Sequence, residues 1–158
     1  MILSSKTWRA IALVLRIALG AVFAYAAWLK LRVPWQLFAG AIGDYKVLPD
    51  WAVAPLARTL PWVELLLGAL LMVGRWTRTA ATAISLLLAG FFTLLVWAFA
   101  NHMDISCGCF GPTGDPISGR TLLRDGALLA VSLTVTWMSY ARRRKAPPAA
   151  IPPDAGDR

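Results

Sequence analysis

The sequence has few charged residues for its length. Of its 158 residues, 15% are charged and 58% are hydrophobic, and the mean hydropathy is +0.61. A soluble domain of this size buries a core beneath a polar surface, and this chain has too little polar material to cover one. The composition therefore excludes an ordinary soluble protein and indicates that lipid surrounds most of the surface. The length predicts one domain.

Acidic residues are scarcer than basic ones. The chain has 16 Lys and Arg against 8 Asp and Glu, which gives a formal net charge of +8. A strongly basic chain is a candidate for nucleic-acid binding, but here the basic residues gather at the ends of apolar runs and form no single solvated face. This distribution excludes nucleic acid as a partner and is typical of a membrane protein.

Four apolar segments approach or reach the roughly 20 residues that a helix needs to cross a bilayer. The second is short, but it can be extended backwards across Pro55 and Pro61 to Trp51. The fourth spans the membrane if Arg124 and Asp125 lie at its interface. Long runs without alternation predict helices and not strands. The segments are residues 11–29, 60–73, 79–100 and 121–140.

These segments predict an all-α fold, an integral membrane four-helix bundle within residues 1–145. Residues 34–42 begin with a proline suited to a first helical turn, and their apolar character predicts an amphipathic helix on the membrane surface, in the outer loop between the first and second spans. Residues 44–49 are expected to turn. Residues 146–158 are rich in Pro, Ala and Asp, which predicts a disordered cytoplasmic tail.

The charges between the spans predict the orientation. Two loops carry both signs, whereas the remaining segments between and beyond the spans are purely basic, and the positive-inside rule places purely basic segments in the cytoplasm. Both termini are then cytoplasmic, and the cysteine loop faces the other side. A signal peptide ending near Ala24-Tyr25-Ala26 is an alternative for the first segment, although its length and Arg16 favour a span. The purely basic segments contain Lys6, Arg9, Arg75, Arg78, Arg142, Arg143, Arg144 and Lys145.

Only two cysteines are present, Cys107 and Cys109, with one glycine between them. In the predicted orientation they face a compartment where disulfides persist. A disulfide between residues i and i+2 closes a small, strained ring, and Gly108 makes it feasible by admitting unusual backbone angles. Strain gives such a disulfide a higher, more oxidising reduction potential than an unstrained one. Because it closes almost no loop, it stabilises the fold little through chain entropy. The spacing therefore favours a redox-active pair that takes part in thiol–disulfide exchange.

Two alternatives stay open for the cysteine pair. One is a static disulfide in a non-catalytic scaffold. The other is a metal-handling or assembly protein that uses the only histidine, His102, with Cys107 and Cys109, because imidazole and thiolate suit zinc or copper. Since the chain has no second cysteine pair, the favoured interpretation contains no metal. In that interpretation His102 favours the thiolate or relays a proton, with Asp104 beside it.

Several charged residues lie in or beside the predicted spans, where such residues usually mark pairing or function. Lys30 and Glu64 both lie toward the outer ends of antiparallel spans, so we expect them to pair. Arg16 lies deeper toward the inner side and is expected to snorkel. Arg124 and Asp125 are expected to anchor the cysteine loop, and Arg124 to stabilise a thiolate. One glycine in each span is expected to allow close helix contacts: Gly20, Gly68, Gly90 and Gly126.

The sequence resembles a known group of membrane proteins over residues 9–140. The first two spans and the loop between them resemble the DoxX-like proteins. The most specific stretch, Cys107-Gly108-Cys109-Phe110-Gly111 followed by Arg124-Asp125, resembles the MauE branch, which is named for methylamine utilisation. The DoxX-like matches are Arg16, Leu19-Gly20, Phe23, Lys30, Tyr45, Leu48-Pro49, Pro61, Glu64 and Gly68.

This resemblance implies a four-helix bundle in the bacterial inner membrane, with the cysteines on the periplasmic side. It implies a role in disulfide formation during the maturation of periplasmic proteins, beside a thioredoxin-like partner. MauE is associated with methylamine dehydrogenase, whose small subunit is rich in disulfides, and relatives in the wider group work with quinones. The expectation is a membrane thiol–disulfide oxidoreductase in which Cys107 and Cys109 exchange with that partner or with client thiols, and a quinone is the candidate electron acceptor.

Overall fold

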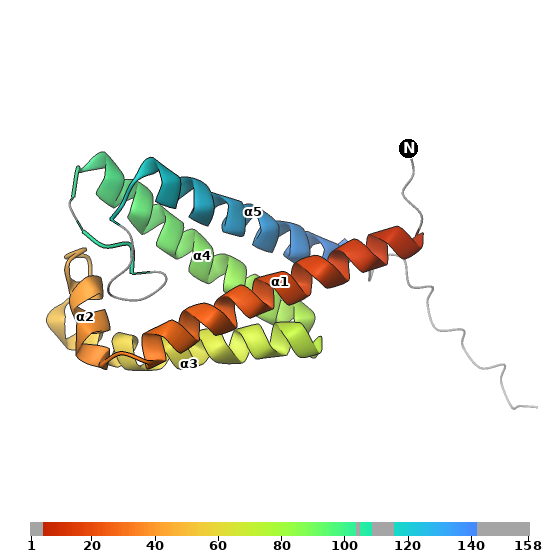
Figure 1. The fold of residues 1–158 in the computed structure, drawn as a ribbon, viewed down its shortest axis with the longest axis horizontal. Helices are drawn as coiled ribbons and strands as arrows, with labels where there is room; N and C mark the ends of the chain where they lie inside the picture. Colours follow the sequence, from red (N-terminus) through yellow and green to blue (C-terminus); the bar gives the residue numbers. More distant parts are fainter. Residues whose placement is uncertain (1–4, 104, 109–115, 142–158) are drawn as a thin grey trace, which may run out of the picture.

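A computed structural model describes residues 5–103, 105–108 and 116–141 of the chain. These residues form five α-helices and no β-strand, so the predicted all-α fold is confirmed. Four long helices run side by side, and the short α2 lies at the same end as the connection between α4 and α5 (Figure 1). The helices are α1 (Ser5–Leu31), α2 (Trp35–Gly43), α3 (Asp50–Val73), α4 (Thr77–Ala100) and α5 (Gly119–Ala141).

Within the described residues, three helices are long and apolar enough to cross a membrane. They identify a multi-pass membrane protein. α5 has 23 residues, which is sufficient length, but it is not one of the three. Its first turns carry Arg120, Arg124 and Asp125, and these charges make it less apolar than the other long helices. The three apolar segments are Thr7–Leu31, Asp50–Val73 and Thr77–Ala100.

The segment between the first two apolar helices folds as the sequence predicts. α2 begins directly after Pro34, whose missing N–H costs a helix nothing at its start. α3 begins at Asp50 and continues without interruption through Pro55 and Pro61. Membrane helices tolerate such prolines because neighbouring groups satisfy the freed backbone atoms. The short apolar run 60–73 is therefore the second half of a full-length helix.

Two of the four span glycines mark close helix contacts between α1 and α3. A Cβ atom added to Gly68 would lie 2.7 Å from the carbonyl oxygen of Gly20, so a side chain there would push the two helices apart. Gly126 of α5 lies against the ring of Phe92 in α4, 3.3 Å from an added Cβ. A Cβ atom added to Gly90 would meet no atom within 4 Å, so the predicted role of this glycine in a helix contact is wrong. Gly90 borders a cavity instead.

The core is apolar and divided between the two ends of the molecule. The larger cluster joins α1, α3, α4 and α5, and it includes Leu19, Leu71 and Ile84. A second cluster, built on Phe38 and Leu60, holds α2 against α3. This second cluster fixes α2 at the end of the molecule that carries the cysteine loop (Figure 1).

A hydrogen-bonded group of hydroxyls ties α4 to α5 inside the bundle. Ser85 of α4 donates to Ser132 of α5 at 3.2 Å, and its hydroxyl lies 3.0 Å from that of Thr136. Interhelical hydroxyl contacts of this kind are common between membrane helices. These hydroxyl contacts hold α5 in register with the apolar helix α4, although the first turns of α5 are charged.

Candidate functional site

Cys107 is almost fully buried, with 1% of its surface exposed, and it follows a tightly terminated α4. His102 has a φ of 52°, and its N–H donates to the carbonyl of Phe99 at 3.2 Å. The next N–H, that of Met103, reaches back to Ala98 at 3.1 Å. This pair of bonds is a Schellman motif. His102 therefore ends the helix through its backbone, while its side chain is exposed.

The described ends of the α4–α5 loop are paired with each other. Ser106 and Pro116 form an isolated antiparallel bridge, and the N–H of Ile117 donates to the carbonyl of Ile105 at 3.2 Å. Gly108 has a φ of 71°, in the region that favours glycine. The unusual backbone angle expected of this glycine is therefore present.

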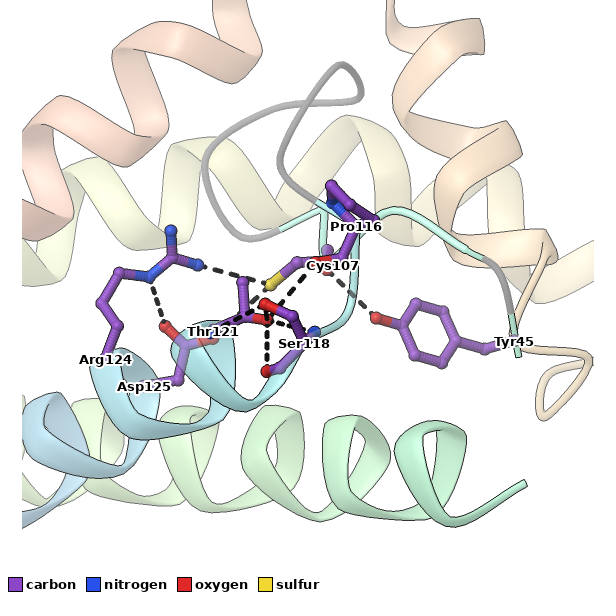
Figure 2. A network of polar contacts seen from close by, with 7 residues as sticks. All are labelled: Tyr45, Cys107, Pro116, Ser118, Thr121, Arg124 and Asp125. Atoms are coloured by element: carbon purple, nitrogen blue, oxygen red, sulfur yellow. Dashed lines mark hydrogen bonds and ion pairs between the residues drawn. The ribbon is translucent and has the colours of Figure 1, made fainter. Parts of the chain in front are cut away.

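The start of α5 is fixed by a reciprocal cap. The N–H of Ser118 donates to the hydroxyl of Thr121 at 2.6 Å, and the N–H of Thr121 points to the hydroxyl of Ser118 at 3.4 Å. This is a capping box with threonine in the place of the usual Glu or Gln. It orients the first turn of α5, so the next turn directs Arg124 and Asp125 toward the loop (Figure 2).

The sulfur of Cys107 lies between the two charged side chains of α5 (Figure 2). Its Sγ atom is 3.5 Å from Asp125 Oδ2 and 3.6 Å from Arg124 Nη2. Arg124 and Asp125 also form an ion pair, with Nε and Oδ1 3.1 Å apart. Both residues therefore contact the cysteine loop at Cys107, as the sequence predicts. A carboxylate and a guanidinium beside one sulfur can accept its proton and stabilise its thiolate, respectively.

Tyr45 contacts the same cysteine from the opposite direction, a contact that the sequence analysis missed. Its hydroxyl donates to the carbonyl oxygen of Cys107 at 3.1 Å, and its side chain comes from the segment that follows α2 (Figure 2). The only signal in the sequence was that Tyr45 is one of the residues shared with the DoxX-like proteins. The loop after α2 thus takes part directly in positioning Cys107.

Lys30 and Glu64 form the predicted ion pair, joining α1 to α3. The Nζ atom of Lys30 lies 2.7 Å from each carboxylate oxygen of Glu64, and both residues are buried. The rings of Phe38 and Phe91 lie 5.3 and 5.9 Å from the same nitrogen, within the range of cation–π attraction. A cavity of about 40 Å³ lies between this pair and Asp125.

A larger apolar cavity opens beside Cys107. Its volume is about 270 Å³, and α2, α3, α4 and the cysteine loop all contribute to its wall. Pockets for small molecules are typically apolar with a few polar groups, and this one has such a lining. Its lining residues include Tyr45, which carries a hydroxyl group, and Cys107 and Gly108 of the cysteine loop. The cavity wall includes Phe38, Tyr45, Gly90, Phe91, Cys107 and Gly108.

Two of the predicted site residues, Asp104 and Cys109, lie outside the described residues. The cysteine pair therefore stays a prediction, as does the alternative in which His102, Cys107 and Cys109 bind a metal. Among the described residues, no group of three His, Cys, Asp or Glu side chains is arranged to hold a metal ion. Of the predicted site residues, the structure brings the side chains of Cys107, Arg124 and Asp125 into contact with one another.

Comparison with known protein families identifies the group to which this site belongs. The model of the family described as "Methylamine utilisation protein MauE" matches residues 8–138. The chain belongs to the MauE family. The matched range includes all the described site residues from Lys30 to Asp125, and the resemblance predicted from the Cys-Gly-Cys-Phe-Gly stretch is confirmed at the level of the family.

Three curated MauE proteins resemble the chain over most of its length. The protein from Paracoccus denitrificans is 35% identical over 123 residues, which cover 77% of this chain and 66% of that protein. The protein from Methylophilus methylotrophus is 38% identical over 117 residues, 72% of this chain and 61% of that protein. The protein from Paracoccus versutus is 35% identical over 131 residues, 82% of this chain and 70% of that protein.

The chain spans roughly two thirds of the length of these MauE proteins. Each of them is named as a methylamine utilization protein. No solved structure matches the chain significantly.

Proposed function

We propose that this protein is a membrane thiol–disulfide redox protein, and that it acts in the maturation of periplasmic proteins that serve methylamine utilisation. The single observation that supports this most is the setting of Cys107, whose sulfur lies 3.5 Å from a buried carboxylate and 3.6 Å from a guanidinium. A cysteine kept only for packing needs neither group. The family assignment links the chain to methylamine utilisation through the names of its relatives.

The proposed reaction has two steps. In the first, Cys107 and Cys109, both as thiols, form a disulfide and release two electrons and two protons to a quinone, which becomes a hydroquinone. In the second, a thioredoxin-like partner with two thiols attacks this disulfide. The partner leaves as the disulfide, and the Cys107–Cys109 pair returns to two thiols. In the first step Asp125 accepts the proton of Cys107, and Arg124 stabilises the Cys107 thiolate that results.

The 270 Å³ cavity beside Cys107 supports the quinone step. Pockets for small molecules have volumes of about 300–1,000 Å³, and this cavity lies just below that range, so it suits a single ring and no larger ligand. The rings of Phe38 and Phe91 offer flat apolar walls, and the hydroxyl of Tyr45 lies at the end next to Cys107. We therefore assign the quinone head group to this cavity, whose wall includes Cys107.

The proposed placement in the membrane follows from charge. α5 is the fourth span of a four-helix bundle, with Arg124 and Asp125 at the interface and the cysteine loop in the periplasm. The purely basic segments at the other end of the molecule lie in the cytoplasm, together with both termini. This orientation of an inner-membrane protein places the cysteine pair in an oxidising compartment, where a thioredoxin-like partner can reach it.

Thiol trapping tests the redox role. Membranes that contain the protein are treated with an alkylating mass tag after growth with or without quinone, and the Cys107→Ser and Cys109→Ser variants are the references. We expect a pair that is oxidised when quinone is present and accumulates as dithiol when quinone is depleted. A pair that stays oxidised in both conditions would indicate a static disulfide. Protection that disappears only with a chelator would indicate the metal site and contradict the proposal.

Gly90 gives a separate test of the cavity. Gly90 lines the cavity, and an added Cβ atom there meets nothing within 4 Å, so Gly90→Leu is chosen to narrow the cavity. We expect this variant to keep its pair reduced in the presence of quinone, and Gly90→Ala to behave as the wild type. Wild-type oxidation in Gly90→Leu would rule out the cavity as the quinone site, while the exchange with a partner could still be correct.

A further inference from the structure

A large cavity lies at the end of the molecule opposite the cysteine site. It has a volume of about 860 Å³ and opens between α1, the start of α4 and the end of α5. Three arginines line it, namely Arg9 and Arg16 from α1 and Arg78 from α4, and none of the described lining residues is acidic. The redox chemistry proposed above uses none of these residues.

Arg16 is held in this cavity without a complete set of partners. Its guanidinium packs against Gly74 at the end of α3, where an added Cβ atom would lie 2.7 Å from Nη1. Within the part of the chain that the structure describes, its buried Nε has no hydrogen-bond partner. A buried donor without an acceptor costs free energy. A bound anion would supply the missing acceptor for Nε, whereas the predicted snorkelling of Arg16 to water would leave this buried atom unsatisfied.

The other groups of the cavity favour the same type of ligand. Arg78 is fixed across the cavity, because its Nε donates to the carbonyl of Ser139 in α5 at 3.0 Å. The first residues of α4, beginning with Thr77, also line the cavity, and the N–H groups at a helix start have no intrahelical partners and carry a partial positive charge. Trp76, the residue before them, offers no side-chain cap.

The position of the cavity suits a lipid. Trp76 and Trp137 are 72% and 62% exposed, and exposed tryptophans of membrane proteins concentrate at the level of the lipid head groups. Leu13, Val135 and Met138 form the apolar part of the wall, where an acyl chain can lie. Basic pockets between transmembrane helices on the cytoplasmic side bind anionic head groups.

We propose that this arginine cavity binds a phosphate group, and that the phosphate belongs to the head group of an anionic phospholipid. The guanidinium groups of Arg16 and Arg78 form charge-assisted hydrogen bonds with the phosphate oxygens, and Arg9 contributes at the rim. The bound lipid closes the gap between α1, α4 and α5 and so stabilises the bundle. This site is independent of the proposed redox function.

Thermal unfolding in a neutral detergent tests the site. The purified full-length protein is titrated with phosphatidylglycerol, with phosphatidylcholine and with inorganic phosphate, and retention of lipid is followed by native mass spectrometry. We expect phosphatidylglycerol to raise the Tm and to stay bound, and phosphatidylcholine to do neither. Arg16→Gln and Arg78→Gln should each weaken phosphatidylglycerol binding by about tenfold or more, since each removes a charge-assisted hydrogen bond.

Two further variants keep the result interpretable. Arg9→Gln alters an exposed side chain at the rim, so it tests the cavity even if the more buried changes unfold the protein, and weaker lipid binding is expected. Arg120→Gln removes an equally exposed charge from the start of α5, at the other end, and should bind as the wild type does. Equal responses to both lipids, or no loss in Arg9→Gln, would overturn the proposal. Stabilisation by inorganic phosphate alone would support the phosphate site and overturn the lipid as its source.

Discussion

Cys107 lies where three separate parts of the chain meet. Its carbonyl accepts a hydrogen bond from Tyr45, 62 residues earlier, and its sulfur contacts Asp125, 18 residues later. A side chain held at both its backbone and its sulfur has little freedom to move. The arrangement keeps the sulfur between a carboxylate and a guanidinium, as the proposed thiol chemistry requires.

The contact between Cys107 and Asp125 predicts a kinetic effect. Asp125→Asn keeps the size of the side chain but removes the group that accepts the proton of the thiol. We expect the oxidation of the cysteine pair to slow by about a hundredfold, the lower limit for a positioned acid or base. Quenched-flow alkylation with the mass tag measures this rate after quinone is added to reduced membranes.

The matched control for this variant is Asp44→Asn, which changes an exposed carboxylate in the turn after α2. Its oxidation rate should equal that of the wild type. If Asp125→Asn lowered the Tm and left the oxidation rate unchanged, Asp125 would be a structural anchor of the loop and would have no part in proton transfer.

At the residue scale, the sequence singles out residues better than it predicts contacts. Residue type and spacing pointed to Cys107 and Arg124, and the structure places the two side chains together, while their chemical roles stay predictions. The hydrogen bond from Tyr45 could not be predicted in that way, because no local pattern relates a loop tyrosine to a carbonyl 62 positions away. His102 is a second case. Its residue type suggested a ligand or a proton relay, whereas its backbone angle gives it the position that glycine usually takes at the end of a helix.

At the scale of the helices, α1 and α3 form the closest pair in the bundle. Gly20 and Gly68 let the two backbones approach, and the buried pair of Lys30 and Glu64 joins the same helices near the cysteine end. The small residues set the distance between the helices, and the ion pair fixes their register. Together they position α2, and through it Tyr45, because α2 connects these two helices.

The buried ion pair predicts an asymmetric response to mutation. Lys30→Met leaves the carboxylate of Glu64 buried without its cation, and we expect the free energy of unfolding to fall by about 3 kcal/mol. Lys30→Met combined with Glu64→Leu removes both charges and should recover most of that loss. Unfolding in a mixed-micelle titration with denaturing detergent measures both variants.

A change of one exposed lysine provides the reference for this comparison. Lys46→Met, in the turn after α2, should leave the unfolding free energy close to that of the wild type. If Lys30→Met were as stable as Lys46→Met, the ion pair would have no stabilising role. If the double variant were no more stable than Lys30→Met, the unpaired carboxylate of Glu64 would not be the cause of the lost stability.

The helices themselves were well predicted from the sequence, and the reason is physical. A run of about 20 apolar residues has few structures available in lipid other than a helix, so α1 and α4 follow directly from hydropathy. α3 was harder because its two prolines resemble helix breaks in the sequence. Gly90 shows what hydropathy cannot supply: a small residue in a span can adjoin another helix or a cavity, and only the packing decides between them.

At the scale of the whole molecule, the two ends differ in charge and in chemistry. α2 and the connection between α4 and α5 lie at one end, and the turn between α3 and α4 lies at the other (Figure 1). Cys107 and Asp125 belong to the first end, and the arginine cavity belongs to the second. The first end has residues of both signs, whereas the second is strongly basic. An asymmetry of this kind orients a membrane protein. In the proposed orientation, the thiol chemistry and the lipid contact lie on opposite sides of the bilayer.

This asymmetry predicts opposite accessibility for the two ends. In a Cys107→Ser, Cys109→Ser background, Asn101→Cys places a thiol at the exposed end of α4 and Trp76→Cys places one at its exposed start. A membrane-impermeant maleimide added to spheroplasts should label the first variant directly. It should label the second only after permeabilisation, because the positive-inside rule holds the basic end in the cytoplasm. The reverse labelling pattern would place the cysteine pair in a reducing compartment, where a disulfide does not persist, and the proposed oxidation of periplasmic proteins would then be impossible.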